Sequence, residues 1–284
     1  MIIKIIDSHQ HFWKLDRGDY GWMTREHGIL LQDYLPKDLE PSMKDQSVSG
    51  TVLVQAAPTL EETLYLLSLF NQHDWIYGVV GWLDLASTNF KEQLHALLQR
   101  QGIVGLRPML QDIEASDWIL QDQVVKNLKE MAEAKLPLDL LITERHIPYV
   151  VTALEKVPSL SAVVDHIAKP NIAKAEINRW KEDMTQLALF PNVSCKVSGL
   201  MTEAKPYSWK LEDFQPYIHH IINTFGSSRI LFGTDWPVCL TAGNYDDAFK
   251  IINKCLPENF STSEKEQLFY LNAKQFYKLM ERNE

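Results

Sequence analysis

The chain has little cysteine and no motif that would pair it. It contains 3 cysteines among 284 residues, Cys195, Cys239 and Cys255, and no two form a Cys-x-x-Cys motif. An odd number of widely spaced cysteines argues against a disulfide framework and is typical of a reducing compartment. The amino-terminal apolar run is too short for a secretory signal and meets a charged residue at once. We therefore expect a cytoplasmic protein.

Long apolar runs and clusters of basic residues are also missing. No stretch approaches the ~20 apolar residues that a membrane span needs. The 28 basic residues are outnumbered by 37 acidic ones, giving a formal net charge of −9. Nucleic-acid binding needs a concentrated basic surface, and no such run of lysine and arginine exists. We expect neither a membrane nor a nucleic acid as partner, and the sequence carries no readable sign of the oligomeric state.

No low-complexity tract or Pro/Gly/Ser-rich linker divides the chain, which predicts one domain over residues 1–284. A glycine-rich turn after the first strand is absent too. The residues there are Ser8 to His11, which differ from the G-x-G-x-x-G of a doubly wound nucleotide-binding sheet. An open doubly wound sheet is therefore the weaker of two α/β alternatives.

Short β-branched runs instead alternate with amphipathic stretches along nearly the whole chain, as in a parallel sheet with crossover helices. A helical stripe over 120–132 is one example, and Ser263 with Glu266 can form the capping box of a closing helix. Eight such repeats predict a single distorted (β/α)8 barrel of the TIM type. The predicted strands are Ile3–Asp7, Thr51–Gln55, Tyr77–Trp82, Ile103–Leu106, Leu138–Ile142, Ala162–Val164, Val193–Val197 and Ile230–Phe232.

The segment 12–38 breaks this alternation with closely spaced aromatic and charged residues. Long excursions after a barrel strand commonly build part of an active site. We interpret 12–38 as an aromatic-rich loop insertion that acts as a lid.

Histidines and an aspartate stand at the ends of three predicted strands. His9 and His11 follow the first strand with one residue between them, so an extended backbone turns both imidazoles to one face. His166 follows the sixth strand, and Asp235 follows the eighth. Singly, each has a structural explanation, as a buried core histidine or a helix N-cap. Because the carboxyl ends of all barrel strands meet at one mouth, we expect the four to converge in a functional site.

Four further residues are predicted to contact substrate. Arg107 ends the fourth strand, where its guanidinium could hold a carboxylate or hydroxyls, or form a salt bridge at the barrel rim. Lys196 on the seventh strand could face the site or extend outward between helices. Trp13 and Trp236 flank the predicted ligands and could stack on a sugar ring, although tryptophans more often belong to the core.

Several motifs together resemble the amidohydrolase-related branch of the amidohydrolase superfamily. Within it, the chain is most similar to the sugar-lactonase group that includes L-fuconolactonase and L-rhamnonolactonase, and the resemblance runs from end to end. The segments that carry it are 7–13, 20–22, 82–84, 105–107, 165–170 (Asp-His-Ile-Ala-Lys-Pro), 195–200, 233–238 (Gly-Thr-Asp-Trp-Pro-Val) and 272–277.

The resemblance implies a barrel with its site at the carboxyl face. His9 and His11 would be the first-strand metal ligands, His166 the sixth-strand histidine, and Asp235 the general base. Arg107 stands where binuclear members carry a bridging lysine, and no histidine ends the fifth strand, so two metals are not expected. One Zn²⁺ or Mn²⁺ held by His9, His11, His166 and Asp235 fits these residue types, and metal-free catalysis stays open as the alternative.

The predicted activity is the opening of a small sugar-derived lactone. Asp235 would take a proton from the attacking water and return it to the ring oxygen, and His166, Arg107 or a metal would stabilise the carbonyl oxygen. The alternatives are a lactone isomerase or decarboxylase of the same superfamily, and a non-catalytic barrel that binds sugar or metal. The sequence does not identify the sugar.

Overall fold

Eight parallel strands, each hydrogen-bonded to its neighbour in sequence, form the centre of the protein. A computed structural model describes residues 3–280, so both ends of the predicted 1–284 domain lie outside the described residues. The strands are β1 (Ile5–Gln10), β2 (Val48–Val54), β3 (Ile76–Gly81), β4 (Ile103–Leu106), β5 (Leu138–Leu140), β6 (Ala162–Val164), β7 (Val193–Val197) and β8 (Ile230–Phe232).

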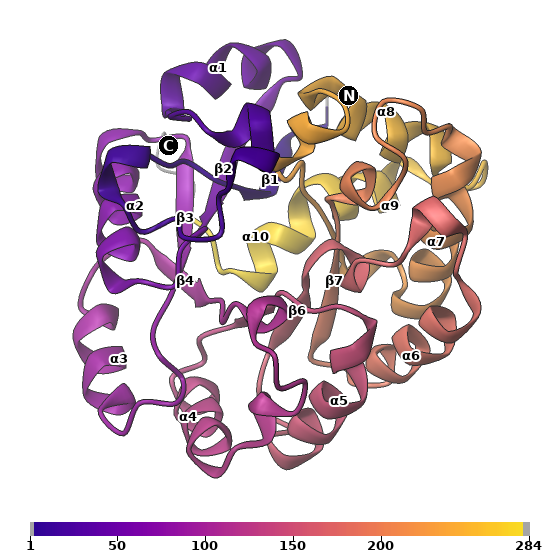
Figure 1. The fold of residues 1–284 in the computed structure, drawn as a ribbon. Helices are drawn as coiled ribbons and strands as arrows, with labels where there is room; N and C mark the ends of the chain where they lie inside the picture. Colours follow the sequence, from indigo (N-terminus) through magenta and orange to yellow (C-terminus); the bar gives the residue numbers. More distant parts are fainter. Residues whose placement is uncertain (1–2, 281–284) are drawn as a thin grey trace.

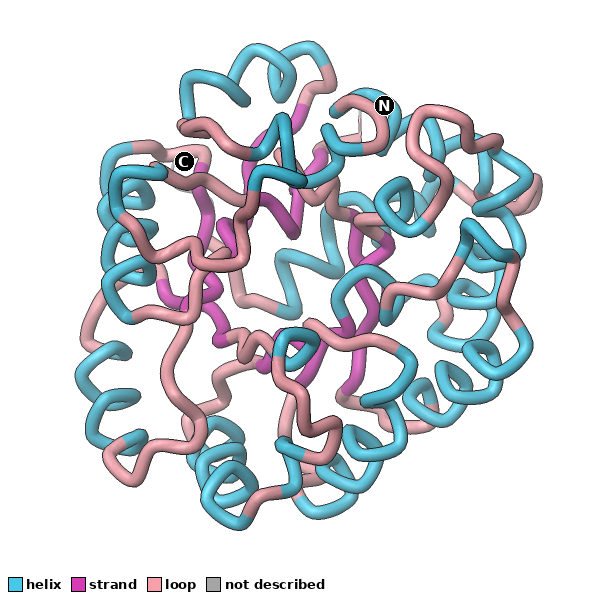
Figure 2. The backbone as a smooth tube through the Cα atoms, in the orientation of Figure 1, coloured by secondary structure: helices cyan, strands magenta, loops and turns pink. Residues whose placement is uncertain are grey.

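A helix follows each strand, and these helices surround the sheet as an outer ring (Figure 1). Figure 2 shows the strands inside this ring and the long loops that join them to the helices. Within residues 3–280, no helix is both long and apolar enough to cross a membrane. The helices are α1 (Pro36–Asp45), α2 (Leu60–Gln72), α3 (Phe90–Leu98), α4 (Asp122–Glu133), α5 (Ile147–Lys156), α6 (Asn178–Ala188), α7 (Leu211–Phe225), α8 (Tyr245–Cys255), α9 (Thr262–Glu266) and α10 (Asn272–Phe276).

The strands are rich in β-branched residues because both of their faces are buried. One apolar layer packs between the strands and the helices. A smaller second cluster contains Val52, Val163 and Leu231 from the strands together with Ala273 and Tyr277 from the carboxyl-terminal segment. The α10 segment therefore packs against the strands, and Figure 1 shows it near the centre of the ring of helices.

The barrel closes between β1 and the residues that follow β8. Gln10 and Trp236 form a parallel bridge. The N–H of His11 donates to the carbonyl of Trp236 over 2.7 Å, and the N–H of Asp235 donates to the carbonyl of His9 over 2.8 Å. The side chain of Asp7 accepts two further bonds from Thr234, at its N–H (2.9 Å) and its hydroxyl (2.5 Å). The two ends of the sheet are thus joined at the predicted site.

The predicted (β/α)8 barrel is confirmed, with differences at its edges. The first strand continues to Gln10, so that His9 lies within it, and the fifth ends at Leu140. The capping box predicted at Ser263 is wrong: Ser261 caps α9 and pairs with Glu264. Both pairs have the same spacing, and the helix begins at the earlier one.

The segment 12–38 contains two short 3-10 helices, Leu15–Arg17 and Arg25–Leu30, and its last residues belong to α1. In Figure 1 its first part (indigo) lies beside β1 and β2. Its aromatic residues pack on one another: the centre of the Trp13 ring lies 5.5 Å from that of Tyr34 and 6.0 Å from that of Trp22. The indole N–H of Trp22 donates to the carbonyl of Ala56, which ties the segment to the loop after β2.

Candidate active site

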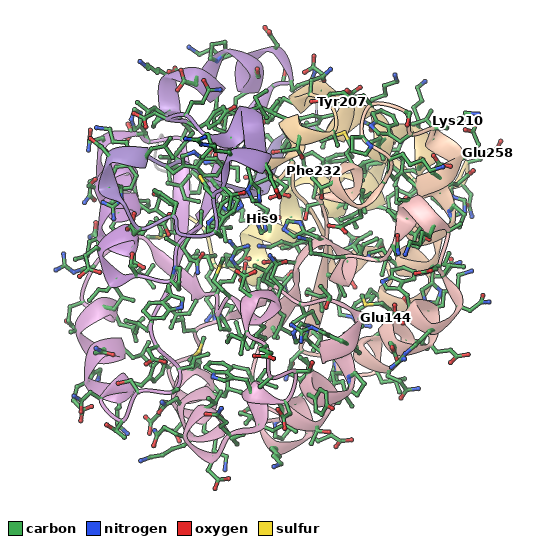
Figure 3. The ribbon with its side chains drawn as sticks, in the orientation of Figure 1. His9, Glu144, Tyr207, Lys210, Phe232 and Glu258 are labelled. Carbon is green, nitrogen blue, oxygen red and sulfur yellow. The ribbon has the colours of Figure 1, made fainter. Side chains whose placement is uncertain are left out.

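Three histidine side chains converge on one carboxylate oxygen. The Oδ1 atom of Asp235 lies 3.3 Å from Nε2 of His11, 3.7 Å from Nε2 of His9 and 3.8 Å from Nε2 of His166. All four side chains are buried, and Figure 3 shows His9 near the centre of the ring. The structure therefore brings together the four residues that the sequence singled out.

The other ring nitrogen of each histidine is occupied, which orients the imidazoles. The Nδ1 atom of His11 lies 2.7 Å from the carbonyl of Val54, and that of His166 lies 2.9 Å from the hydroxyl of Ser198. Since a carbonyl oxygen can only accept, the Nδ1 atom of His11 donates to Val54, and its Nε2 atom faces Asp235. The Nδ1 atom of His9 lies 3.3 Å from Oδ1 of Asp165.

Burial sets the charges of this group. It lowers the pKa of His9 well below its ordinary value and that of His166 to about 4, so both imidazoles are neutral at pH 7. Burial alone would raise the pKa of Asp235. The neighbouring His166 and the hydrogen bond to His11 outweigh that effect, so the pKa is lowered and Asp235 is a carboxylate.

The residue types and their protonation states fit a divalent metal. Single ligand atoms of His9, His11 and Asp235 all lie within 4.8 Å of one another, as do those of His9, Asp165 and His166. Neutral imidazoles and an ionised carboxylate are the forms that bind Zn²⁺. Partners on the second ring nitrogen of each histidine are also typical of metal sites.

A network of buried charges lies behind His9. The Nζ atom of Lys196 is 2.5 Å from Oδ2 of Asp139, 3.1 Å from Oδ1 of Asp165 and 3.2 Å from Nδ1 of His9. The hydroxyl of Tyr277, just after α10, donates to Oδ2 of Asp139 over 2.7 Å. Lys196 therefore faces the barrel interior but lies under the site, and its side chain has no exposed surface.

Arg107 joins this network to the cavity. Its Nη1 atom lies 3.3 Å from Nε2 of His9 and 3.3 Å from Oδ2 of Asp165. Its Nη2 atom donates to the backbone carbonyl and to the side-chain oxygen of Gln55. The two terminal nitrogens of the guanidinium are thus held by protein groups, whereas its Nε atom has no hydrogen-bond partner. Arg107 nevertheless lines the cavity.

A cavity of about 430 Å³ opens above the four converging residues. This volume suits a small-molecule ligand. Of the predicted residues, His11, Trp13, Arg107, His166 and Asp235 line it, whereas His9, Lys196 and Trp236 do not. Trp236 packs beneath the 12–38 segment, with its ring 5.1 Å from Tyr34 and 5.7 Å from Phe12.

Several lining residues were not singled out as site residues from the sequence. Some of them carried a local indication: Lys169 belongs to the same short motif as His166, Val238 to the motif of Asp235, and Trp22, His27 and Leu30 to the segment 12–38 interpreted as a lid. The others carry no local signal of function. These residues are Trp22, His27, Leu30, Ala56, Met109, Gln111, Asp112, Leu141, Lys169, Thr202, Glu203, Val238 and Thr241.

Comparison with known proteins gives a consistent match over nearly the whole chain. The amidohydrolase family model matches residues 6–279. A curated L-fucono-1,5-lactonase from Burkholderia ambifaria is 36% identical, covering 96% of this chain and 95% of that protein. A second L-fucono-1,5-lactonase, from Burkholderia multivorans, is 32% identical over 97% and 96%. A crystal structure of an amidohydrolase from Burkholderia multivorans with bound zinc superposes with a TM-score of 0.91 at 32% identity, covering 98% and 100%.

Proposed function

The chain belongs to the amidohydrolase family, and we propose that it hydrolyses a sugar lactone, with an aldono-1,5-lactone as the substrate. One observation carries the proposal: an ionised Asp235, ringed by three histidine Nε2 atoms, forms part of the wall of a small-molecule cavity. Two relatives that match this chain over almost their whole length are L-fucono-1,5-lactonases, which supports this substrate class.

Asp235 is the residue to which we assign proton transfer. Its carboxylate takes a proton from water as the water oxygen attacks the lactone carbonyl, and the ring carbon–oxygen bond then breaks. The same carboxyl group returns that proton to the departing ring oxygen, which becomes a hydroxyl. The products are the open hydroxy acid, which ionises and releases one proton to solution, and the regenerated Asp235 carboxylate.

Donors beside Asp235 can stabilise the charge that develops on the carbonyl oxygen. Arg107 lines the cavity, and its guanidinium can donate hydrogen bonds to a developing oxyanion. Asp165 and Gln55 hold its guanidinium in one position. We assign Arg107 to this role, and we assign Trp13 to the apolar face of the substrate.

We further infer that His9, His11, His166 and Asp235 hold one divalent metal ion. The neutral imidazoles support this, as does the zinc in the similar Burkholderia multivorans structure. When bound, the ion would act as a Lewis acid toward the carbonyl and the water. The compartment we propose is the cytoplasm, since the three cysteines are free thiols in the structure.

The test is a pH-indicator assay with L-fucono-1,5-lactone and related aldonolactones. We expect wild-type protein to release acid and Asp235→Asn to lose about 10²- to 10⁴-fold in kcat. Asp45→Asn, which changes an exposed aspartate at the end of α1, serves as the matched control and retains full activity. A wild-type protein that opens no sugar lactone would refute the proposed function.

The metal is tested separately on the same preparation. We expect elemental analysis to find about one divalent ion per chain, and a chelator to remove the ion together with the activity. Added Zn²⁺ or Mn²⁺ then restores both. Full activity in protein shown to contain no metal would contradict this part of the proposal and leave the lactonase assignment standing.

A further inference from the structure

A second polar group lines the cavity and has no part in the chemistry described above. The Nζ atom of Lys169 donates to Oε1 of Gln111 over 3.1 Å and lies 3.5 Å from Oε1 of Glu203. The hydroxyl of Thr202 donates to the same Glu203 oxygen over 3.3 Å. All four residues line the cavity that Asp235 also lines.

Three separate loops bring this group together. Gln111 follows β4, Lys169 ends the turn after β6, and Glu203 lies in the 3-10 helix Leu200–Glu203 after β7. The backbone of Lys169 is left-handed, with φ +50°. Residues that meet from three loops at the carboxyl end of a barrel are in the position where such folds bind their substrates.

The ion pair differs from the charges beneath the site in its accessibility. The side chains of Lys169 and Glu203 are 22% and 21% exposed, whereas those of Lys196, Asp139 and Asp165 are 0% exposed. A partly exposed pair contributes little to stability. Its donors and acceptors remain within reach of a ligand in the cavity.

The lysine and the arginine that line the cavity already lie beside carboxylates, which restricts the ligand. Lys169 lies beside Glu203, and Arg107 lies beside Asp165, which it shares with Lys196. Among the described lining residues, no lysine or arginine lacks an acidic partner, and Asp235 and Asp112 add further negative charge. A ligand carboxylate beside Lys169 would therefore have to displace Glu203. A hydroxyl can instead accept from the Lys169 ammonium and donate to the Glu203 carboxylate at the same time.

We propose that Lys169, Glu203 and Gln111 form a specificity subsite that binds the ring hydroxyls of an uncharged polyhydroxylated lactone and disfavours lactones that carry carboxylates. The inference rests on the proposed function and extends it from the reacting bond to the rest of the substrate. Under this assignment, the three residues determine which lactone binds and take no part in proton transfer.

The test compares hydroxylated and unsubstituted substrates. The ratio of kcat/KM for a fully hydroxylated six-membered aldonolactone to that for δ-valerolactone is measured in wild type, Lys169→Met and Glu203→Gln. We expect each variant to lower this ratio by about 10- to 100-fold, because each removes charge-assisted hydrogen bonds that only the hydroxylated substrate can make. Wild type should also prefer the aldonolactone over a lactone dicarboxylate.

Lys91→Met and Glu130→Gln are the matched controls. Their side chains form an ion pair with a distance of 2.8 Å between α3 and α4, outside the Asp235 cavity. Both controls should keep the wild-type ratio. A ratio within twofold of wild type in folded Lys169→Met and Glu203→Gln, or a wild-type preference for the dicarboxylate, would overturn the subsite.

Direct binding separates this inference from the proposed hydrolysis. A sugar lactam, in which a ring N–H replaces the ring oxygen, resists hydrolysis and is titrated calorimetrically. We expect Lys169→Met and Glu203→Gln to weaken its binding at least 10-fold. If both variants bind the lactam more weakly but the wild-type protein hydrolyses no lactone, the proposed lactonase activity is refuted and the subsite is supported. The subsite is refuted, even if hydrolysis is observed, when both variants bind the lactam as tightly as wild type does. It is also refuted when wild type does not bind the lactam.

Discussion

The backbone N–H of Asp235 donates to the backbone carbonyl of His9 across 2.8 Å. The first strand and the loop after the last strand are thereby joined at two residues of the site. Closure of the barrel and assembly of the histidine–aspartate cluster consequently depend on the same contacts. Small displacements near this closure should change activity as well as stability.

Gly199 has a left-handed backbone (φ +63°), and a Cβ atom there would lie 2.5 Å from Nδ1 of His166. Gly199→Ala should therefore lose about 1–2 kcal/mol from backbone strain and push His166 away from Ser198, with more than a 10-fold loss in kcat. Gly226→Ala is the control, because its φ is +71° but nothing lies within 4 Å of the added atom. Urea unfolding should show that both variants are destabilised, and lactone assays should show the loss in kcat in Gly199→Ala alone. Equal activity in both variants would refute the steric argument.

Lys196 is the shared partner of the buried Asp139 and Asp165. Lys196→Met should lower the free energy of unfolding by about 3–5 kcal/mol, because it leaves buried carboxyl groups without their counter-charge. The exposed ion pair of Lys91 and Glu130 offers the comparison, and Lys91→Met should change stability by less than about 1 kcal/mol. If the two variants unfold at similar urea concentrations, the buried network does not stabilise the fold as described.

The hydroxyl of Tyr277 donates to the buried Asp139. The hydroxyl of Tyr207 donates to the carbonyl of Leu240, but Tyr207 itself is 70% exposed. Tyr277→Phe should destabilise the protein by about 1–3 kcal/mol, because the buried Asp139 loses a hydrogen-bond donor. Tyr207→Phe should stay within about 0.5 kcal/mol of wild type, as exposed substitutions usually do. Chemical denaturation of the pair measures the difference, and a larger loss in Tyr207→Phe would contradict it.

Glu62 in α2 accepts hydrogen bonds from the N–H groups of Ala56 and Ala57. Burial raises its pKa from 4.5 to about 7, although those bonds oppose the rise. The folded state therefore binds the proton more tightly than the unfolded state does. The stability that this group contributes is complete below pH 4.5 and is lost as the pH rises toward 7.

Glu62→Gln resembles the protonated acid and should escape this loss. Its free energy of unfolding relative to wild type should increase between pH 5 and 8, by about 3 kcal/mol for the full shift. Denaturation series at several pH values measure this gain. The control is Glu264→Gln, because the hydrogen bonds to Ser261 lower the pKa of Glu264 and predict no such gain. A pH-independent difference for Glu62→Gln would show that Glu62 does not titrate in this range.

The fold was predictable because its signals are local. Most of the buried strands are short runs rich in β-branched residues. Their alternation with helices, without a glycine-rich turn after the first strand, indicates a barrel. The positions of His9, His11, His166 and Asp235 could be derived in the same way, since residues at the carboxyl ends of parallel strands must meet. Boundaries were less predictable: Ser261 and Ser263 both have a glutamate three residues later, and only packing selects Ser261 as the cap.

The partners of each site residue were decided by the tertiary structure. Lys196 alternates along its strand in a way that permits an inward position, but its contacts with Asp139 and Asp165 depend on strands far away in sequence. Lys169 and Glu203 meet because two loops, each free to vary in length, come together at the mouth. The barrel and the residues at its strand ends follow from local sequence patterns, because periodicity acts over a few residues. Loop conformation and barrel closure determined which of those residues touch, because such contacts join distant parts of the chain.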